Sequence, residues 1–365
     1  MLKYVSLDAQ WQSERSDLLD IIESVLSSGN YIGGETVEAF ETRVAKVCGV
    51  QHAVALNSGT DALVCSMHAL GIRPGDEVIT PPNSFIASTA SIVHLGAVPV
   101  FVDVLDDQSI DASLIEKHIT SKTRAIMPVH LTGRMADMQA VNEIADLHNL
   151  FVIEDAAQSI GSKVDERLSG SWGHVGCFST HPLKNLNACG DGGFVTTNDE
   201  DVAKKIKLMR NHGMADRNTV ETFGYVSRLD AIQAAILNYR IEHLDEVTLR
   251  RRANAERYRS LLNENYVLCP AENSRFFDTF HTFVIQVSRR DELQNFLLKN
   301  GVQTAIHYPV PIHLQPAAAG LGYQFGDFPK TEFQSKRILT LPINQFVTAK
   351  DVEFVADLVN EFFEV

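Results

Sequence analysis

The sequence predicts an α/β protein with a large, mainly parallel α/β/α domain followed by a smaller α+β C-terminal domain. Three observations lead to this prediction. Up to about residue 200, short and largely apolar segments alternate with helical segments, as in a parallel sheet covered on both faces. After about residue 225 this alternation stops and a long helical segment begins. The length of 365 residues suits two domains, which we place at 1–240 and 241–365.

The large domain is expected to begin with two helices and to continue with alternating strands and helices. Apolar side chains recur at helical spacing in 15–28 and 35–48. Strands are predicted at His52–Leu56, Glu77–Thr80, Val98–Val102, Ala125–Val129, Phe151–Ile153, Cys177–Thr180 and Gly193–Thr197. Helices are predicted at Ala62–Leu70, Ile86–Leu95, Leu114–Ile119 and Met138–His148.

A long helix from Leu229 to about Leu262, rich in Arg and Ala, is expected to join the two domains. The smaller domain would then mix strands and helices around a Pro-rich loop. Its strands are predicted at His281–Val287 and Val302–Ile306, its helices at Asp291–Leu298, near 330–339 and at 350–362, and its loop from Pro309 to Pro316.

The composition excludes several classes of protein. Apolar residues make up 45% and charged residues 21% of the chain, which excludes a disordered protein. The formal net charge of −14 argues against non-specific binding of nucleic acid. Any anionic ligand must therefore meet a local positive potential, from a helix N-terminus or a few Arg and Lys residues.

The sequence also favours a cytoplasmic protein with no membrane partner. The opening residues, MLKYVSLDAQWQSER, lack the apolar core of a signal peptide. The longest largely apolar stretch, 90–104, contains His94 and is too short to span a bilayer. The five cysteines are scattered and form no C-x-x-C pair, as is typical of the reducing cytosol and not of a disulfide scaffold or zinc site.

Three segments that follow predicted strands carry reactive or anion-binding groups. Ligands of open α/β sheets bind beyond the carboxyl ends of the strands, so these segments form the candidate site. The first is Ser58-Gly59-Thr60, after the strand that ends at Leu56. Its hydroxyls and backbone N–H groups suit a phosphate or carboxylate at a helix N-terminus, and a plain N-cap is the alternative.

The second segment, Glu154–Asp155, places two carboxylates at a strand end. Adjacent side chains of a strand point to opposite faces, so one carboxylate can face a ligand while the other is solvated or caps a helix. The third segment holds Lys184, which follows Pro182 and precedes the Gly-rich turn 190–193. A lysine with a lowered pKa forms a Schiff base readily, although most surface lysines are inert.

A phosphate site, a carboxylate and an amine together match the needs of pyridoxal 5′-phosphate (PLP). The PLP aldehyde condenses with a lysine, a carboxylate keeps the pyridine nitrogen protonated, and the phosphate needs an anchor. The three segments therefore predict one PLP site. No metal site is expected, because His307 and His313 have no carboxylate or cysteine nearby at ligand spacing.

Ten stretches, in order along nearly the whole chain, match one family. They are GGETVEAFE (33–41), NSGTDAL (57–63), GDEVITPPNSFIAS (75–88), GAVPVFVDV (96–104), PVHLTG (128–133), VIEDAAQSIG (152–161), FSTHPLKNLNACGDGG (178–193), RNHGM (210–214), SRLDAIQAAIL (227–237) and HYPVPIHLQ (307–315). In these stretches the sequence resembles the DegT/StrS-type sugar-nucleotide aminotransferases, which belong to the fold type I PLP-dependent transferases. The resemblance implies that fold.

The resemblance also implies a role for each residue that matches the family pattern. Lys184 would form the Schiff base and shuttle a proton between the substrate carbon and the cofactor. Asp155 would pair with the pyridinium nitrogen, and Gln158 would contact the ring oxygen. Phe85 would stack on the ring, for which ordinary core packing is the alternative. Asn185 follows the lysine as in many relatives and is a further candidate contact.

The phosphate would bind Ser58, Gly59, Thr60 and Ser179, again by resemblance. One departure concerns Val226, since relatives often carry Asn there, which reaches the phosphate of the neighbouring subunit's cofactor. Valine has no side-chain donor, so this contact is absent or another group supplies it. The resemblance still implies a homodimer with active sites at the subunit interface.

The reaction implied by the resemblance is transamination, because dehydratases of the family have His where this chain has Lys184. An amino acid, expected to be L-glutamate, would convert PLP to pyridoxamine 5′-phosphate. The amino group would then pass to a nucleotide-linked keto-6-deoxy sugar, in amino-sugar biosynthesis for a surface polysaccharide or a glycoside. The 307–315 loop resembles that of enzymes that aminate C-3; a purely structural loop is the alternative. Candidate substrate-binding residues are His181, Arg228, His307, Tyr308 and His313.

Two other functions remain open at this point. The substrate could be a 4-keto sugar, a cyclitol ketone or another sugar acid, which product regiochemistry would decide. A PLP-fold protein kept as a regulator is an alternative of another class. The intact set of Asp155, Gln158 and Lys184 argues against a regulator, and only Val226 argues for it. A nicotinamide-dependent enzyme is disfavoured because no G-x-G-x-x-G follows the first strand.

Overall fold

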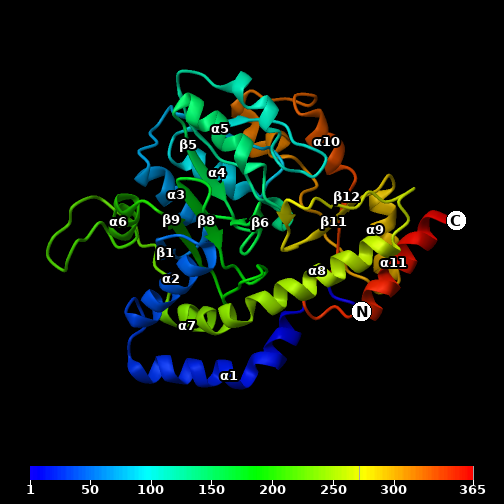
Figure 1. Ribbon diagram of the computed structural model, residues 1–365, viewed down its shortest axis with the longest axis horizontal. Helices are drawn as coiled ribbons and strands as arrows, with labels where there is room; N and C mark the ends of the chain where they lie inside the picture. Colours follow the sequence, from blue (N-terminus) through cyan, green and yellow to red (C-terminus); the bar gives the residue numbers. More distant parts are fainter. Residues whose placement is uncertain (271, 365) are drawn as a thin grey trace.

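The computed structural model describes residues 1–270 and 272–364, and a seven-stranded sheet forms the centre of the N-terminal part (Figure 1). The strands lie in the order β1-β9-β8-β5-β4-β2-β3. Five of them pair in parallel, whereas β9 is antiparallel to both of its neighbours. Their bounds are β1 His52–Leu56, β2 Glu77–Thr80, β3 Val98–Phe101, β4 Thr123–Ile126, β5 Phe151–Asp155, β8 Val175–Ser179 and β9 Gly193–Thr197.

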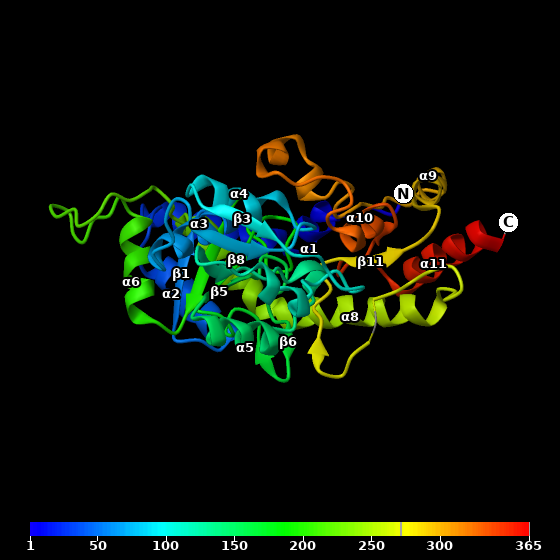
Figure 2. The same cartoon turned by 90° about the horizontal axis from the view of Figure 1, so that it is seen from above.

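Helices cover both faces of this sheet because its side chains alternate between two apolar layers. In β1, Val54 and Leu56 pack with α3, α4 and α6, whereas Ala53 and Ala55 pack with α2 and α7. Figure 2 shows α4 on one side of the sheet and α5 on the other. The helix bounds are α2 Glu35–Cys48, α3 Gly59–Ala69, α4 Ile86–His94, α5 Met138–His148, α6 Glu200–Met209 and α7 Ala231–Arg240.

The C-terminal part packs around a small antiparallel sheet and the far end of a long helix. Helix α8 (Leu244–Leu261) leads from beneath the large sheet to this part of the molecule (Figure 1). It packs against α11, and its Ala255 and Tyr258 join the same apolar cluster as β11, β12, α9 and α11. The bounds are β11 Phe283–Gln286, β12 Ile338–Leu341, α9 Arg290–Lys299, α10 Pro329–Ser335 and α11 Ala349–Glu364.

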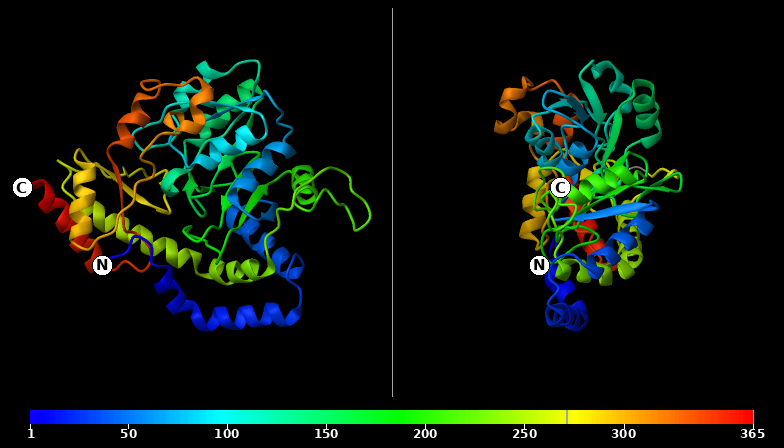
Figure 3. Two further views of the ribbon diagram at one scale, coloured as in Figure 1. Left: turned by 180° about the vertical axis from the view of Figure 1, so that it is seen from behind. Right: turned by 90° about the vertical axis from the view of Figure 1, so that its left-hand side faces the viewer.

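Several segments tie the two parts together. Helix α1 (Leu7–Ser28) packs along α7, and Leu2 before it packs into the C-terminal cluster. Strand β10 (Phe276–Phe277) pairs with the hairpin of β6 (Lys163–Val164) and β7 (Arg167–Leu168). Ile312 and Phe328 pack against Phe101 of β3. Figure 3 shows the two ends of the chain on the same side of the molecule.

The fold class is confirmed, and several elements have the predicted bounds: 35–48, His52–Leu56, Glu77–Thr80, Met138–His148 and Gly193–Thr197. The long helix is interrupted by a 3-10 turn at Ile241–His243. The helix predicted at Leu114–Ile119 is wrong, because two 3-10 turns, Ala112–Leu114 and Glu116–His118, occupy that region. The strand predicted at Val302–Ile306 is also wrong, because only isolated bridges form there.

The described C-terminal region contains two strands, β10 and β12, that the sequence pattern did not indicate. The helix expected near 330–339 ends at Ser335, and β12 begins at Ile338. The division into 1–240 and 241–365 stays a proposal. The separate apolar clusters of the large sheet and of the β11–β12 sheet support it. Within residues 1–270 and 272–364, no helix is long and apolar enough to cross a membrane.

Candidate active site

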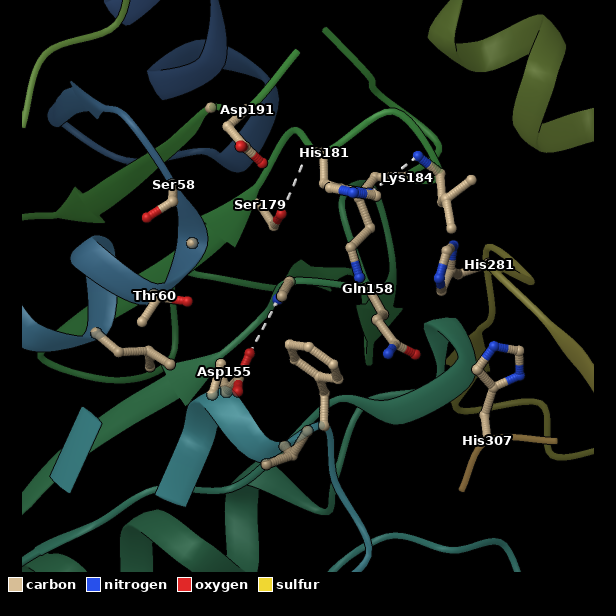
Figure 4. A pocket seen from close by; sticks show the side chains of 18 of the residues that line it. Ser58, Thr60, Asp155, Gln158, Ser179, His181, Lys184, Asp191, His281 and His307 are labelled. Atoms are coloured by element: carbon tan, nitrogen blue, oxygen red, sulfur yellow. Dashed lines mark hydrogen bonds between the residues drawn. The ribbon is translucent and has the colours of Figure 1, made fainter. Parts of the chain in front are cut away.

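A cavity of about 430 Å³ lies beyond the carboxyl ends of β5 and β8, and Figure 4 shows the side chains around it. Its walls come from the turn after β1, the segments after β5 and β8, and two segments of the C-terminal part. The lining residues predicted from the sequence are Ser58, Gly59, Thr60, Phe85, Asp155, Gln158, Ser179, His181, Lys184, His307 and Tyr308. These eleven residues therefore meet at one place.

Lys184 lies in a tight turn after β8 that holds its side chain in the cavity. The Lys184 N–H donates to the His181 carbonyl at 2.8 Å, and the side-chain amide of Asn187 donates to the Pro182 carbonyl at 2.7 Å. Burial lowers the pKa of the Lys184 amine to about 8, and the charge of Asp155 opposes this shift. The amine therefore loses its proton, and becomes nucleophilic, much more readily than that of an ordinary lysine.

The two carboxylates at the end of β5 have different surroundings. Glu154 is fully buried and accepts hydrogen bonds from the N–H groups of Gly170, Trp172 and Gly173 and from His130 Nε2. The expectation that the second carboxylate is solvated or caps a helix is therefore wrong. Glu154 anchors the loop between β7 and β8, and Asp155 alone faces the cavity.

Asp155 is held in place by two donors. Ser88 Oγ of α4 donates to Asp155 Oδ2 at 2.6 Å, and the Ala157 N–H donates to Oδ1 at 3.3 Å. Burial raises the pKa of Asp155, while the Ser88 hydrogen bond and the charge of Lys184 oppose the increase. A buried carboxylate of this kind stabilises a cationic group placed against it.

The turn between β1 and α3 lies directly against the end of β8. Ser58 Oγ accepts a hydrogen bond from the Asp61 N–H, so this side chain does cap the helix. The first N–H groups of a helix have no partner inside the helix, so Gly59 and Thr60 keep theirs for an anion. A Cβ atom on Gly59 would come within 2.8 Å of Ser179 Cβ, so glycine permits this close approach.

Aromatic and amide groups form the opposite wall. The rings of Phe85 and Tyr308 lie 5.8 Å apart between centroids, and the Phe85 side chain is half-exposed at the rim. Gln158 Oε1 accepts a hydrogen bond from the Thr132 N–H at 2.8 Å, which fixes the amide. In Figure 4, Gln158 lies between Asp155 and the imidazoles of His281 and His307.

Three of the predicted site residues lie outside the cavity lining. Asn185 is buried beside it and donates to the Thr279 carbonyl at 3.0 Å. Arg228 Nη1 donates to Asn211 Oδ1. His313 is buried against Phe328, and its Nε2 lies 3.1 Å from Glu332 Oε1, so the expected contact of His313 with substrate is not supported.

Some residues of the site were not identified from the sequence. Ser88 lies in the first turn of α4, where a serine has no distinctive signal. His281 and Asp191 line the cavity, and the pKa of the His281 imidazole falls well below 6.5 because of burial and the nearby charge of Lys184. His281 comes from the C-terminal part, about 100 residues beyond Lys184, so local sequence patterns do not place it here.

The arrangement fits a flat cofactor that carries an aldehyde, a ring nitrogen and a phosphate. Lys184 supplies the amine, and Asp155 supplies the buried carboxylate for a protonated nitrogen. The N–H groups of Gly59 and Thr60 suit the phosphate. Figure 4 shows Ser58 and Thr60 on the side of the cavity opposite His281 and His307. The residues present therefore fit PLP.

Comparisons with known proteins agree with this chemistry. The sequence profile of the DegT/DnrJ/EryC1/StrS aminotransferase family matches residues 12–360. The dTDP-3-amino-3,4,6-trideoxy-alpha-D-glucose transaminase of Streptomyces venezuelae is 41% identical, over 99% of this chain and 96% of its own length. A pleiotropic regulatory protein of Geobacillus stearothermophilus is 39% identical, over 98% of each chain. The crystal structure of DesV from S. venezuelae superposes with a TM-score of 0.97 at 41% identity, covering 99% of this chain and 98% of that one.

Proposed function

The chain belongs to the DegT/DnrJ/EryC1/StrS aminotransferase family, a family of PLP-dependent sugar aminotransferases, and from this premise we propose a specific reaction for it. The protein moves an amino group from L-glutamate to C-3 of a nucleotide-linked keto-6-deoxy sugar. The product is an amino sugar for a surface polysaccharide or a glycoside. The observation that carries this proposal is that Lys184 and Asp155 face one cavity, with the Ser58–Thr60 turn on its wall.

Bound in this cavity, PLP supplies an aldehyde that exchanges amines and a protonated ring that accepts electrons from the reacting carbon. The chain's own residues would fix and complete that chemistry. Asp155 would hold a proton on the ring nitrogen, oriented by the hydrogen bond from Ser88 Oγ. Gln158 would bind the ring oxygen, and Phe85 would cover a ring face.

Lys184 would act as the acid and base of both half-reactions. Its amine would take the proton from Cα of the donor and later give a proton to C-3 of the sugar. The pKa of about 8 suits both duties near neutral pH. Ser58, Gly59, Thr60 and Ser179 would bind the phosphate and so place the ring against Lys184.

The acceptor is proposed from the rim of the cavity and from the relatives. His307 and Tyr308 reach the cavity from the C-terminal part, and His181 lines it from the segment after β8, so these three are the proposed sugar-binding residues. The S. venezuelae relative is named for an amino group at C-3. A 4-keto sugar or a cyclitol ketone is the substrate that the test below must exclude.

We also propose a homodimer. Phe85 and Leu183 line the cavity and yet are 56% and 43% exposed, so a second subunit would cover apolar surface at the rim. The segment after α6 projects from the body of the molecule (Figure 1), and its Phe223 side chain is 99% exposed. Val226 on the same segment is exposed and cannot bind a phosphate through its side chain.

A regulatory role without catalysis is favoured by Val226 and by the name of the G. stearothermophilus relative. Against it, Asp155, Gln158 and Lys184 are all present and all line the cavity. A protein that no longer bound a cofactor would have no need of a lysine and an aspartate buried together. The site therefore favours an enzyme.

The test follows the absorbance of bound cofactor through both half-reactions. Wild-type protein loaded with PLP should lose its visible band with L-glutamate and regain it with a nucleotide-linked 3-keto-6-deoxy sugar. The 4-keto isomer should restore the band much more slowly. Lys184→Ala should support neither change. A wild-type protein that binds no PLP, or whose band L-glutamate leaves unchanged, would contradict the proposal.

A further inference from the structure

A second, smaller cavity of about 60 Å³ adjoins the first and shares four lining residues with it: Leu183, Lys184, His281 and His307. Its other walls are residues 4–7 and 343–346 together with Gln10, Pro182, Asn187 and Arg251. Among the residues that the structure describes, no Asp or Glu lines this cavity, whereas Lys184 and Arg251 both do. In a chain with a net charge of −14, this is a local concentration of positive charge.

Arg251 of α8 is 6% exposed and is bound only by neutral acceptors. Its Nη1 donates to the carbonyl oxygens of Phe280 and His281 at 3.1 and 3.0 Å. Its Nη2 donates to Gln345 Oε1 at 3.3 Å, and its Nε has no partner. Within the described part of the chain, no carboxylate pairs with this guanidinium. A buried charge without a counter-ion is costly, so an anion is expected beside it.

The other deeply buried arginines of the described residues each pair with a carboxylate. Arg134 donates through Nε and Nη2 to Asp278 at 3.0 and 2.7 Å. Arg240 uses the same two atoms on Glu14, at 3.0 and 2.6 Å, and Arg290 pairs with Asp291. In Arg251 this edge has a free Nε and a long hydrogen bond on Nη2. It is the edge that binds a carboxylate with two parallel hydrogen bonds.

We propose that Arg251 binds the α-carboxylate of the amino donor, in the cavity beside Lys184. A carboxylate fits a space of about 60 Å³, whereas a nucleotide diphosphate does not. The shared Lys184 places that carboxylate next to the amine that must act on the donor's Cα. Asn187 and Gln345 add amide groups on the same walls. This inference rests on the proposed aminotransferase function, because only then does an amino acid enter the site.

The test measures binding of glutarate, which has the carboxylates of L-glutamate but no amino group to react. Calorimetric titration of PLP-loaded wild type, Arg251→Gln and Arg251→Lys gives a dissociation constant for each. We expect that constant to rise roughly 30-fold or more in Arg251→Gln and less in Arg251→Lys, which keeps the charge but not the two-pronged geometry. Arg250→Gln is the matched control, because Arg250 is exposed and pairs with Glu246.

A second measurement separates the donor from the sugar. Arg251→Gln should slow the reaction of the PLP form with L-glutamate much more than it slows the reaction of the pyridoxamine 5′-phosphate form with the keto sugar. Glutarate binding that stays within about twofold of wild type would overturn the inference, as would an equal loss in both half-reactions. If L-glutamate leaves the visible band of PLP-loaded wild-type protein unchanged, that result would instead overturn the proposed function. If Arg251→Gln does not fold, the glutarate affinity of Arg251→Lys takes its place. A crystal structure of the wild type with glutarate then shows whether a carboxylate lies against Arg251.

Discussion

Ser88 Oγ lies 2.6 Å from Asp155 Oδ2 and donates a hydrogen bond that orients the carboxylate toward the cavity. This bond favours the ionised carboxylate and lowers a pKa that burial raises. We expect Ser88→Ala to raise the pKa of Asp155 further, so the acidic limb of the pH–rate profile moves to higher pH. The affinity for PLP should fall roughly tenfold. Ser91→Ala, also buried on α4, is the control and should leave the profile in place.

Removing the charge of Glu154 and removing that of the neighbouring Asp155 should change the stability of the protein in opposite directions. Glu154→Gln places an amide against three backbone donors, so the free energy of unfolding should fall by roughly 3 kcal/mol or more. Asp155→Asn removes a carboxylate whose pKa burial raises, so the apoprotein should be more stable at neutral pH. Its turnover should fall roughly a hundredfold or more. Chemical denaturation measures the stability of the two variants, and steady-state kinetics measures their turnover. Equal changes of stability in Glu154→Gln and Asp155→Asn would contradict the different roles assigned to the two carboxylates.

The depressed pKa of Lys184 predicts how the stability of the apoprotein depends on pH. The folded state holds this proton less tightly, with a pKa of about 8 against an ordinary value of 10.5. The charged amine therefore destabilises the folded state, fully so below pH 8. This destabilisation disappears as the pH rises from about 8 to 10.5. Lys184→Met should therefore be more stable than wild type at pH 7, and the difference should shrink at higher pH. Urea denaturation at several pH values measures it, and a difference that does not vary with pH would argue against a buried amine.

Gly59 predicts a steric effect on the phosphate site. In Gly59→Ala the new Cβ would come within 2.8 Å of Ser179 Cβ and push the start of α3 away from β8. The affinity for PLP should fall at least roughly tenfold, while the affinity for a donor carboxylate changes little. Gly320→Ala is the matched control, because nothing lies within 4 Å of its Cβ position. Fluorescence titration with PLP compares them, and equal affinities would mean that the turn does not hold the phosphate.

The parts of the site that follow strands could be predicted from the sequence. Ser58, Asp155 and Lys184 each come after an apolar run that does form a strand, and the carboxyl ends of β1, β5 and β8 lie at the same edge of the sheet, which brings the three residues together. The same reasoning failed for Glu154, because its partners lie in the loop between β7 and β8. Nothing in the sequence beside Glu154 indicates that this loop folds back over it.

Other features depend on contacts between distant segments. The pattern of Gly193–Thr197 predicts a strand, and its antiparallel direction is seen only in its pairing with β1 and β8. The run near 330–339 looks helical throughout, yet Ile338–Leu341 pairs with Phe283–Gln286. Arg251 and His281 reach the lysine from the C-terminal part through packing around α8. Local patterns contain no information about such long-range placement.

The most direct test of the account is the position of the transferred nitrogen. PLP-loaded protein would be incubated with L-glutamate labelled with heavy nitrogen and an equal mixture of nucleotide-linked 3-keto and 4-keto 6-deoxy sugars, and NMR would locate the label. We expect labelled nitrogen on C-3, and none in any product with Lys184→Ala. Labelled nitrogen on C-4 would contradict the proposed substrate. Unlabelled sugar after incubation with wild-type protein that had taken up PLP would contradict the proposed reaction.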